Sequence, residues 1–345
     1  MKYTTLPNTD IKVSKICLGT MTYGEQNNEA EGHEQIDFAL DKGVNFLDTA
    51  EMYSIPGKAE TQGSTEEIIG SWFKKSGKRE EVVLASKVVG PGNAMYHIRE
   101  NLGFSKEAVT DALHKSLKRL QTDYIDLYQL HWPERNTNFF GKLGYEHDEN
   151  EAWEENFQEV LETLSDFVKE GKIRQVGLSN ETPYGVMRFL EESRKHDLPK
   201  MITVQNPYNL LNRKDEVGLT EVLHRENVGL FPYSPLGMGT LSGKHLDGIE
   251  PNSRLGLFSQ YKRYSGDVAV KATRAYSEIA KKHNLNFAQM SLAFVNTRPF
   301  VTSNIIGATS IKQLEENIGS IDVELSKEVL EEINKVHETY PNPAP

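Results

Sequence analysis

Four ionisable side chains in this sequence follow apolar runs of residues. Asp48 comes directly after one run, and Tyr53 follows five positions later. Lys87 lies just past a second run, and His131 directly follows a third. Taken alone, Asp48 and Tyr53 are explained equally well by a structural role, as a helix-capping aspartate and a packed tyrosine, and by a role in chemistry. Lys87 and His131 favour the role in chemistry, because the strand ends of α/β enzymes carry the reacting groups.

The chemistry that suits these side chains is proton transfer to a carbonyl oxygen. A phenol has an ordinary pKa of about 10, and a nearby ammonium lowers that pKa. We expect Lys87 to act on Tyr53 in this way and Asp48 to hold Lys87 in place. His131 would donate a hydrogen bond to a substrate oxygen while a hydride reaches the carbon. Hydrolysis and metal catalysis fit less well, because the sequence has neither a serine nucleophile elbow nor a close cluster of metal ligands.

Apolar runs and amphipathic segments alternate along the whole chain. We predict a hairpin from 3–6 and 13–16, and buried strands over 16–19, 44–47, 82–85, 124–130, 173–178, 201–204, 228–231 and 304–306. Helices are predicted over 28–42, from a cap at Ser64 to Gly77, from a cap at Ser105 to Leu120, over 155–170, from Pro183, and over 216–226, 268–283, 287–298, 311–318 and 326–336. Strands that alternate with helices form a parallel sheet, and eight such units indicate an α/β fold, a (β/α)8 TIM barrel with an N-terminal β-hairpin cap. The segment from Glu134 to Glu154 is a long loop, which we expect to influence substrate choice.

Polar side chains stand where the predicted strands end. They are Asp48, Lys87, His131, Asn180, Gln205 and Tyr233. The carboxyl ends of barrel strands share one face, so these side chains should converge although they are far apart in sequence.

A hydride requires a donor that side chains cannot supply. The glycine-rich loop 233–244 is the expected cradle, because its glycines let backbone amides approach a pyrophosphate. Lys244 and Arg254 would add positive charge, and Tyr233 could stack on a nicotinamide ring.

A Rossmann fingerprint is the weaker alternative for this loop. Gly237 and Gly239 have the required spacing, but the third glycine comes one position late. The loop also lies near the end of the chain and not after a first strand, where that fingerprint occurs.

Composition limits the remaining possibilities. The chain has 345 residues and no linker, so we expect a single domain over 1–345. A net charge of −11 argues against a nucleic-acid partner. The one cysteine, Cys17, cannot form an internal disulfide and lies in an apolar run, as expected for a buried thiol in a reducing compartment. With no apolar signal core and no membrane-length run, we expect a cytoplasmic protein without a membrane partner.

Together these residues resemble the aldo-keto reductase family. The resemblance rests on Asp48, Tyr53, Lys87 and His131, and on the segments LGTM at 18–21, GLSN at 177–180, QN at 205–206 and YSPL at 233–236. Each motif alone is weak, but the set is specific and covers nearly the whole chain. The chain is also similar to voltage-gated potassium-channel β subunits through Ser253, Arg254 and the segment GATS at 307–310.

The resemblance implies an NADPH-dependent reductase of aldehydes or ketones, with a small-molecule carbonyl substrate. Tyr53 would be the proton donor, Lys87 and Asp48 would tune it, and His131 would orient the carbonyl. The implied cofactor contacts are Gly19, Thr20, Met21, Asp48, Ser179, Asn180, Gln205, Tyr233, Ser234, Pro235, Leu236, Gly237, Gly239, Leu241, Ser242, Gly243, Lys244 and Arg254. At the adenosine end they are Gly307, Thr309, Ser310, Gln313, Glu316 and Asn317. No metal is implied.

The chain departs from the family pattern at the expected 2′-phosphate site. Many relatives place lysine and arginine there, whereas this chain has Gly307 and Gln313. Ser310, Lys312 and Arg254 could compensate, so NADP remains the expected cofactor and NAD the less favoured one. A second class of function also fits the resemblance, a regulatory subunit that senses a nicotinamide cofactor and turns over substrate only incidentally.

Overall fold

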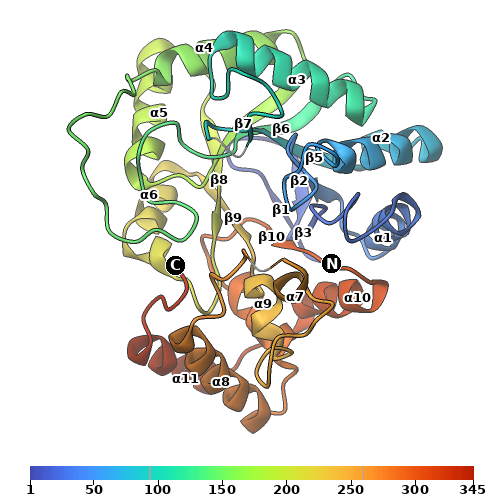
Figure 1. Ribbon diagram of the computed structural model, residues 1–345, viewed down its shortest axis with the longest axis vertical. Helices are drawn as coiled ribbons and strands as arrows, with labels where there is room; N and C mark the ends of the chain where they lie inside the picture. The colour runs from blue at the N-terminus through green and yellow to red at the C-terminus, as the bar shows by residue number, and fades with distance from the viewer. Residues whose placement is uncertain (93–94, 259) are drawn as a thin grey trace.

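The computed structural model describes residues 1–92, 95–258 and 260–345, and its centre is an eight-stranded parallel sheet closed into a barrel (Figure 1). Its strands are β3 (Ile16–Gly19), β4 (Phe46–Asp48), β5 (Val83–Val88), β6 (Ile125–Leu130), β7 (Ile173–Ser179), β8 (Met201–Pro207), β9 (Gly229–Tyr233) and β10 (Asn304–Ile306). β10 pairs with β3, and Leu230 of β9 exchanges backbone hydrogen bonds with Phe300 and Thr302, so the ring closes. The predicted (β/α)8 barrel is confirmed.

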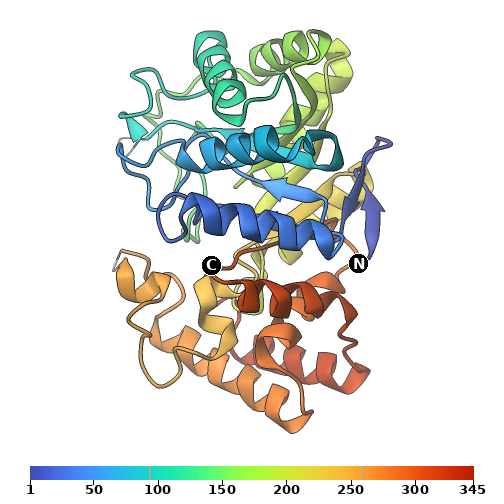
Figure 2. The ribbon, with the colours of Figure 1, turned by 90° about the vertical axis from the view of Figure 1, so that its right-hand side faces the viewer.

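Helices cover the outside of the barrel (Figures 1 and 2). They are α1 (Glu29–Asp41), α2 (Ser64–Ser76), α3 (Lys106–Leu120), α4 (Phe157–Lys169), α5 (Pro183–His196), α6 (Leu219–Glu226), α8 (Asp267–Lys282), α9 (Phe287–Asn296), α10 (Ile311–Gly319) and α11 (Lys327–Thr339). A further single turn, α7 (Arg254–Leu257), lies at the mouth of the barrel. No helix of the described residues combines the length and the hydropathy needed to cross a membrane.

Most helix starts follow the sequence signals. Ser105 caps α3 by accepting from the amide of Ala108, as expected for a serine at this position. The prediction that Ser64 caps α2 is wrong, because Gly63 takes the cap position with a φ of 82°. The Ser64 hydroxyl instead donates to the carbonyl of Thr61 at 2.7 Å.

The N-terminal hairpin closes one end of the barrel. β1 (Tyr3–Thr5) and β2 (Lys12–Ser14) pair antiparallel, and they lie at the right of Figure 2. Leu6 and Val13 pack in one apolar cluster with Phe46 and Phe231 from the barrel strands. The hairpin and this cluster block the N-terminal end, so a ligand must enter from the C-terminal ends of the strands.

Several strands run further than their apolar runs suggested. β5 continues to Val88 and therefore includes Lys87, and β8 continues to Pro207 and includes Gln205. Backbone pairing is indifferent to side-chain polarity, so a ladder continues past the last apolar residue. In the loop after β9, the chain also forms a short 3₁₀ helix at Gly237–Ser242 and the single turn α7.

Candidate active site

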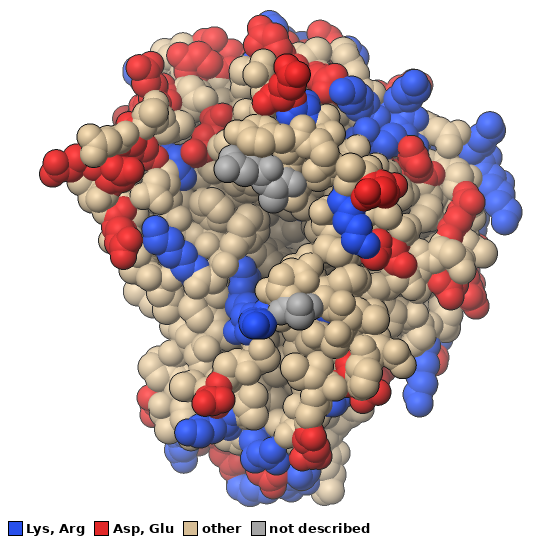
Figure 3. Space-filling view, viewed as in Figure 1, with Lys and Arg blue, Asp and Glu red and all other residues tan. Residues whose placement is uncertain are grey.

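A cavity of about 1580 Å³ opens at the C-terminal ends of the strands. Figure 3 shows it as a hollow in the centre of this face, with basic side chains along its lower edge. Its walls come from the barrel strands, from the loop after β6 and from the loop after β9. The polar strand-end residues that were expected to converge do meet here.

Lys87 and Asp48 form a buried ion pair at the base of this cavity. The Lys87 Nζ donates to Asp48 Oδ2 at 2.7 Å and to the carbonyl of Thr49 at 2.8 Å. The second carboxylate oxygen accepts from Gln205 Nε2 at 2.8 Å. Lys87 Nζ also lies 5.0 Å from the centre of the Tyr53 ring. These contacts fix one positive charge beneath the phenol.

The pKa of Tyr53 is governed mainly by burial. Burial raises this pKa, the Lys87 ammonium lowers it, and the Asp48 carboxylate raises it again, so the balance lies above the ordinary value. Lys87 therefore acts on the phenol in the expected direction, but burial outweighs it. Burial also acts to lower the pKa of Lys87, but Asp48 and the phenol outweigh it and the pKa is raised. Tyr53 is protonated and Lys87 is charged at neutral pH.

His131 stands beside Tyr53 as a neutral imidazole. The two rings meet edge to face with 5.8 Å between their centres. Burial and then the nearby Lys87 charge hold the pKa of His131 well below its usual range. Its Nδ1 has no hydrogen-bond partner among the residues that the structure describes. A neutral imidazole at this place can hydrogen-bond a carbonyl oxygen without competing for the role of acid.

A second buried ion pair holds the loop that carries Tyr53. The Glu51 carboxylate pairs with the Arg99 guanidinium and accepts from the amide of Val89 at 2.8 Å. The Glu51 amide donates to the carbonyl of Lys87 at 3.2 Å. The loop is therefore joined to β5 at the residue that faces Tyr53.

Amide and hydroxyl groups form another corner of the cavity. Asn180 donates through Nδ2 to the carbonyl of His131 at 2.9 Å, and Tyr233 donates through its hydroxyl to Asn180 Oδ1 at 2.7 Å. Ser179 Oγ donates to the carbonyl of Gln205 at 2.9 Å. These bonds orient the group, which can present hydrogen bonds to a planar carboxamide.

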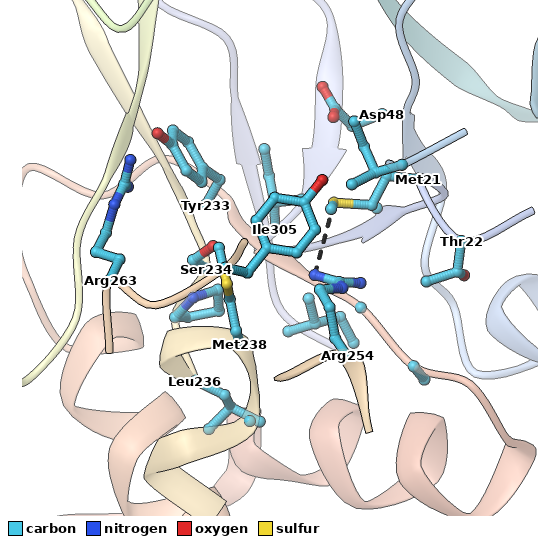
Figure 4. Close-up of a pocket in the computed structure, with 18 of the residues that line it drawn as sticks. Met21, Thr22, Asp48, Tyr233, Ser234, Leu236, Met238, Arg254, Arg263 and Ile305 are labelled. Atoms are coloured by element: carbon cyan, nitrogen blue, oxygen red, sulfur yellow. Dashed lines mark hydrogen bonds between the residues drawn. The ribbon is translucent and has the colours of Figure 1, made fainter. Parts of the chain in front are cut away.

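The loop after β9 has the backbone of an anion cradle. Gly237, Gly239 and Gly243 all have positive φ, at 54°, 95° and 84°. A Cβ on Gly239 would lie 2.6 Å from Lys244 Cε, so a side chain there would displace the lysine. Arg254 reaches across the cavity toward Met21, with 4.0 Å between Nη1 and Sδ (Figure 4).

The polar atoms that line the cavity fit a dinucleotide. Thr22 Oγ1, Gln26 Oε1 and Arg254 Nε are buried and have no hydrogen-bond partner within the described parts of the chain. An unpaired buried polar atom costs roughly 1–3 kcal/mol, so such atoms are typical of a surface that meets a ligand. Phosphates and ribose hydroxyls supply the acceptors and donors that these atoms need.

The far end of the cavity is formed by the start of α10. Ser310 caps this helix by accepting from the amide of Gln313. Gln313 Oε1 in turn accepts from the Thr309 amide at 3.0 Å and from its hydroxyl at 3.1 Å. The space around Gly307 is open, because a Cβ there would meet nothing within 4 Å among the described residues.

Most of the predicted site residues line this cavity. Five do not: Lys87, Gly237, Leu241, Gly243 and Ser310 support it from behind or beside it. Several other side chains also line the cavity and were not predicted from the sequence, among them Thr22, Gln26, Met52, Trp132, Phe139, Phe140, Tyr261 and Arg263. Thr22 and Gln26 follow the LGTM segment and could have been found from it. Met52 and Trp132 are the sequence neighbours of Tyr53 and His131, and the remaining side chains come from loops whose path cannot be predicted from residue spacing.

Comparison with known proteins agrees with this architecture. Residues 15–338 match the Aldo/keto reductase family. The chain is 51% identical to Protein tas of Escherichia coli (strain K12) over 347 residues, covering 100% of both chains. It is 32% identical to the uncharacterized oxidoreductase YrpG of Bacillus subtilis (strain 168), covering 99% of this chain and 97% of the other. An aldo-keto reductase of Babesia bovis is 37% identical over 279 residues, covering 76% of this chain and 98% of the other. The chain therefore belongs to the aldo/keto reductase family and is an oxidoreductase.

Proposed function

We propose that this protein reduces aldehydes or ketones to alcohols with NADPH, and that Tyr53 is the proton donor. The observation that carries the proposal is the buried Lys87–Asp48 pair, 2.7 Å between Nζ and Oδ2, set beneath a protonated phenol at the cavity wall. The reduced nicotinamide, when bound, supplies a hydride to the carbonyl carbon.

The side chains complete the other half of the reaction. The Tyr53 O–H bond breaks, and its proton goes to the carbonyl oxygen, so that the product is the alcohol. Lys87 lies 5.0 Å from the ring and stabilises the phenolate that results. Neutral His131 donates a hydrogen bond to the same oxygen and orients it. Solvent then returns a proton to Tyr53.

The cofactor would lie along the residues already described. Ser179, Asn180 and Gln205 suit the carboxamide, and Tyr233 presents a ring for stacking. The glycine loop with Lys244 and Arg254 suits the pyrophosphate and the 2′-phosphate, and the start of α10 suits the adenosine. We further propose that the chain acts as a single domain in the cytoplasm, in keeping with its buried free thiol Cys17.

The test is NADPH consumption with a panel of aldehydes and ketones, measured for the wild type and for Tyr53→Phe. We expect turnover by the wild type and a loss of about 10²- to 10⁴-fold in the variant. Tight NADPH binding without turnover of any carbonyl would contradict this proposal and support the cofactor-sensing regulatory alternative.

A further inference from the structure

Arg263 lines the cavity on the side of Tyr233, away from Arg254 (Figure 4). Its backbone is anchored by the next residue, Tyr264, which is completely buried. The Tyr264 hydroxyl accepts from Asn209 Nδ2 at 3.3 Å, and a Cβ on Gly237 would lie 3.1 Å from the Tyr264 ring. Arg263 is therefore presented from a fixed position.

The Arg263 guanidinium has no carboxylate within 4 Å in the described ranges of the chain. Three other guanidiniums that are mostly withdrawn from solvent have a counter-ion, whereas Arg254, like Arg263, has none among the described residues. Arg99, Arg119 and Arg135 each lie against a glutamate. The Tyr233 and Tyr264 hydroxyls hydrogen-bond the Arg263 guanidinium but do not neutralise its charge. A partly buried charge without a counter-ion is costly, so its retention at a cavity wall indicates a ligand that carries the opposite charge.

The surface next to Arg263 is largely apolar, although the Pro345 oxygen also lies near Gly141 at the cavity wall. The loop after β6 approaches so closely that a Cβ on Gly141 would lie 3.2 Å from Arg263 Nε. The same loop contributes Phe139 and Phe140, whose rings meet edge to face with 5.1 Å between centres. Trp132 packs on Phe140 at 5.7 Å. A ligand here would have an apolar body and an anionic end.

The other positively charged side chains at the cavity are paired, lie near the expected cofactor phosphates or are exposed to solvent. Lys87 is paired with Asp48. Lys244 and Arg254 lie by the glycine loop, where the dinucleotide phosphates are expected, and Lys262 is exposed to solvent. Arg263 is therefore the cation best placed for a substrate group.

We propose that Arg263 binds a carboxylate on the carbonyl substrate, so that the preferred substrates are aldehydes or ketones with an apolar body and a carboxylate remote from the reacting carbonyl. The planar fork of a guanidinium matches a carboxylate, and one cation balances its single charge. This inference rests on the proposed reductase function.

The test compares 4-formylbenzoate with its methyl ester, which differ in the charge at the remote end. We expect the wild type to show a kcat/KM about tenfold higher for the carboxylate, within the range of one charge-assisted pair. In Arg263→Gln the ratio should fall to within about threefold of one, while the Kd for NADPH stays within about twofold. Lys142→Gln removes a charge next to Gly141 but not from the cavity wall, and should keep the wild-type ratio.

Three results would overturn the inference. The first is a wild type that reduces both compounds equally well. The second is an Arg263→Gln variant that keeps the preference. The third is a parallel loss for both compounds with a weaker Kd for NADPH, which would place Arg263 on the cofactor.

A binding measurement separates this inference from the proposed function. Protein loaded with NADPH is titrated with 4-(hydroxymethyl)benzoate and with its methyl ester in a calorimeter. We expect the carboxylate to bind about tenfold more tightly to the wild type than to Arg263→Gln, and the ester to show no such difference. If this holds and neither aldehyde is reduced, the proposed function fails and the anionic subsite stands. If the ester is reduced and the carboxylate shows no advantage in rate or binding, the proposed function stands and the anionic subsite fails.

Discussion

Lys87 and Asp48 bury an ion pair in which neither side chain exposes more than 4% of its surface, with 2.7 Å between Nζ and Oδ2. The pair is almost unscreened by water, so its positive end acts strongly on the phenol of Tyr53. Loss of either partner leaves the other charge buried and unpaired, which is the costly outcome. Variants of this region should therefore affect stability and catalysis together.

Replacing Tyr53 by Phe should abolish most turnover and leave cofactor affinity nearly intact. The hydroxyl is proposed to act on the carbonyl oxygen and not on the dinucleotide. The expected loss in kcat is about 10²- to 10⁴-fold. Steady-state kinetics and the Kd for NADPH check both parts. A variant that kept more than roughly half of the wild-type kcat would show that Tyr53 is not the proton donor.

Lys87→Met should reduce kcat/KM more than His131→Ala does. Lys87 stabilises the charge that develops on Tyr53, and its removal also leaves Asp48 unpaired. His131 is neutral and contributes orientation and one hydrogen bond. Thermal unfolding of both variants controls for global destabilisation. The opposite ranking, at comparable stability, would assign proton donation to His131.

Wild-type protein should prefer NADPH to NADH by at least about tenfold in Kd, equal to about 1.4 kcal/mol, and Arg254 should carry much of this preference. Its guanidinium is withdrawn from solvent, which lowers its pKa, and it has no ion-pair partner among the residues described. In Arg254→Ala we expect weaker NADPH binding and little change for NADH. Lys271→Ala, on the exposed face of α8, is the matched control.

Equal losses for both cofactors in Arg254→Ala would place the guanidinium on the shared pyrophosphate. Specificity would then lie in the segment from Thr309 to Asn317. A wild type that bound NADH as tightly as NADPH would refute the preference itself.

Asp215→Asn should stabilise the protein more at pH 8 than at pH 4. Burial raises the pKa of Asp215 from 3.8 to about 6, although Lys214 and the Asn206 amide lower it. As the pH rises through this window, the unfolded chain loses the proton before the folded chain does, so stability falls. The penalty reaches about 3 kcal/mol above pH 6 and then stays constant.

Urea unfolding from about pH 4 to pH 8 checks this expectation. The free-energy difference between Asp215→Asn and the wild type should grow up to about pH 6.5 and then level off. The exposed Asp123→Asn is the control. A difference that did not change with pH would contradict the raised pKa.

Arg99→Met should destabilise the protein by about 3–5 kcal/mol, because it leaves Glu51 buried without its partner. It should also lower kcat, since Glu51 joins the Tyr53 loop to β5. The double variant Glu51→Gln with Arg99→Met should recover part of the stability. Urea unfolding measures all three proteins. If the double variant were no more stable than Arg99→Met, the loss would come from packing and not from an unpaired charge.

The sequence by itself determined the barrel and the convergence of its polar strand ends. The core strands are almost entirely buried, so their sequences are largely apolar, and the polar residues at their carboxyl ends mark the site. This rule is local, and it located Asp48, His131, Asn180 and Tyr233 without coordinates.

Only the tertiary structure decided how these groups are charged and what surrounds them. Whether the pKa of Tyr53 lies above or below its usual value depends on the combined effects of burial, the Lys87 cation and the Asp48 anion. These effects can be combined only when the positions of all three groups are known. The Glu51–Arg99 pair and the position of Arg263 depend on how long loops cross the mouth of the barrel. Loop paths are set by contacts between distant segments, such as Arg263 with Gly141 and Tyr264 with Gly237, and no local periodicity encodes those contacts.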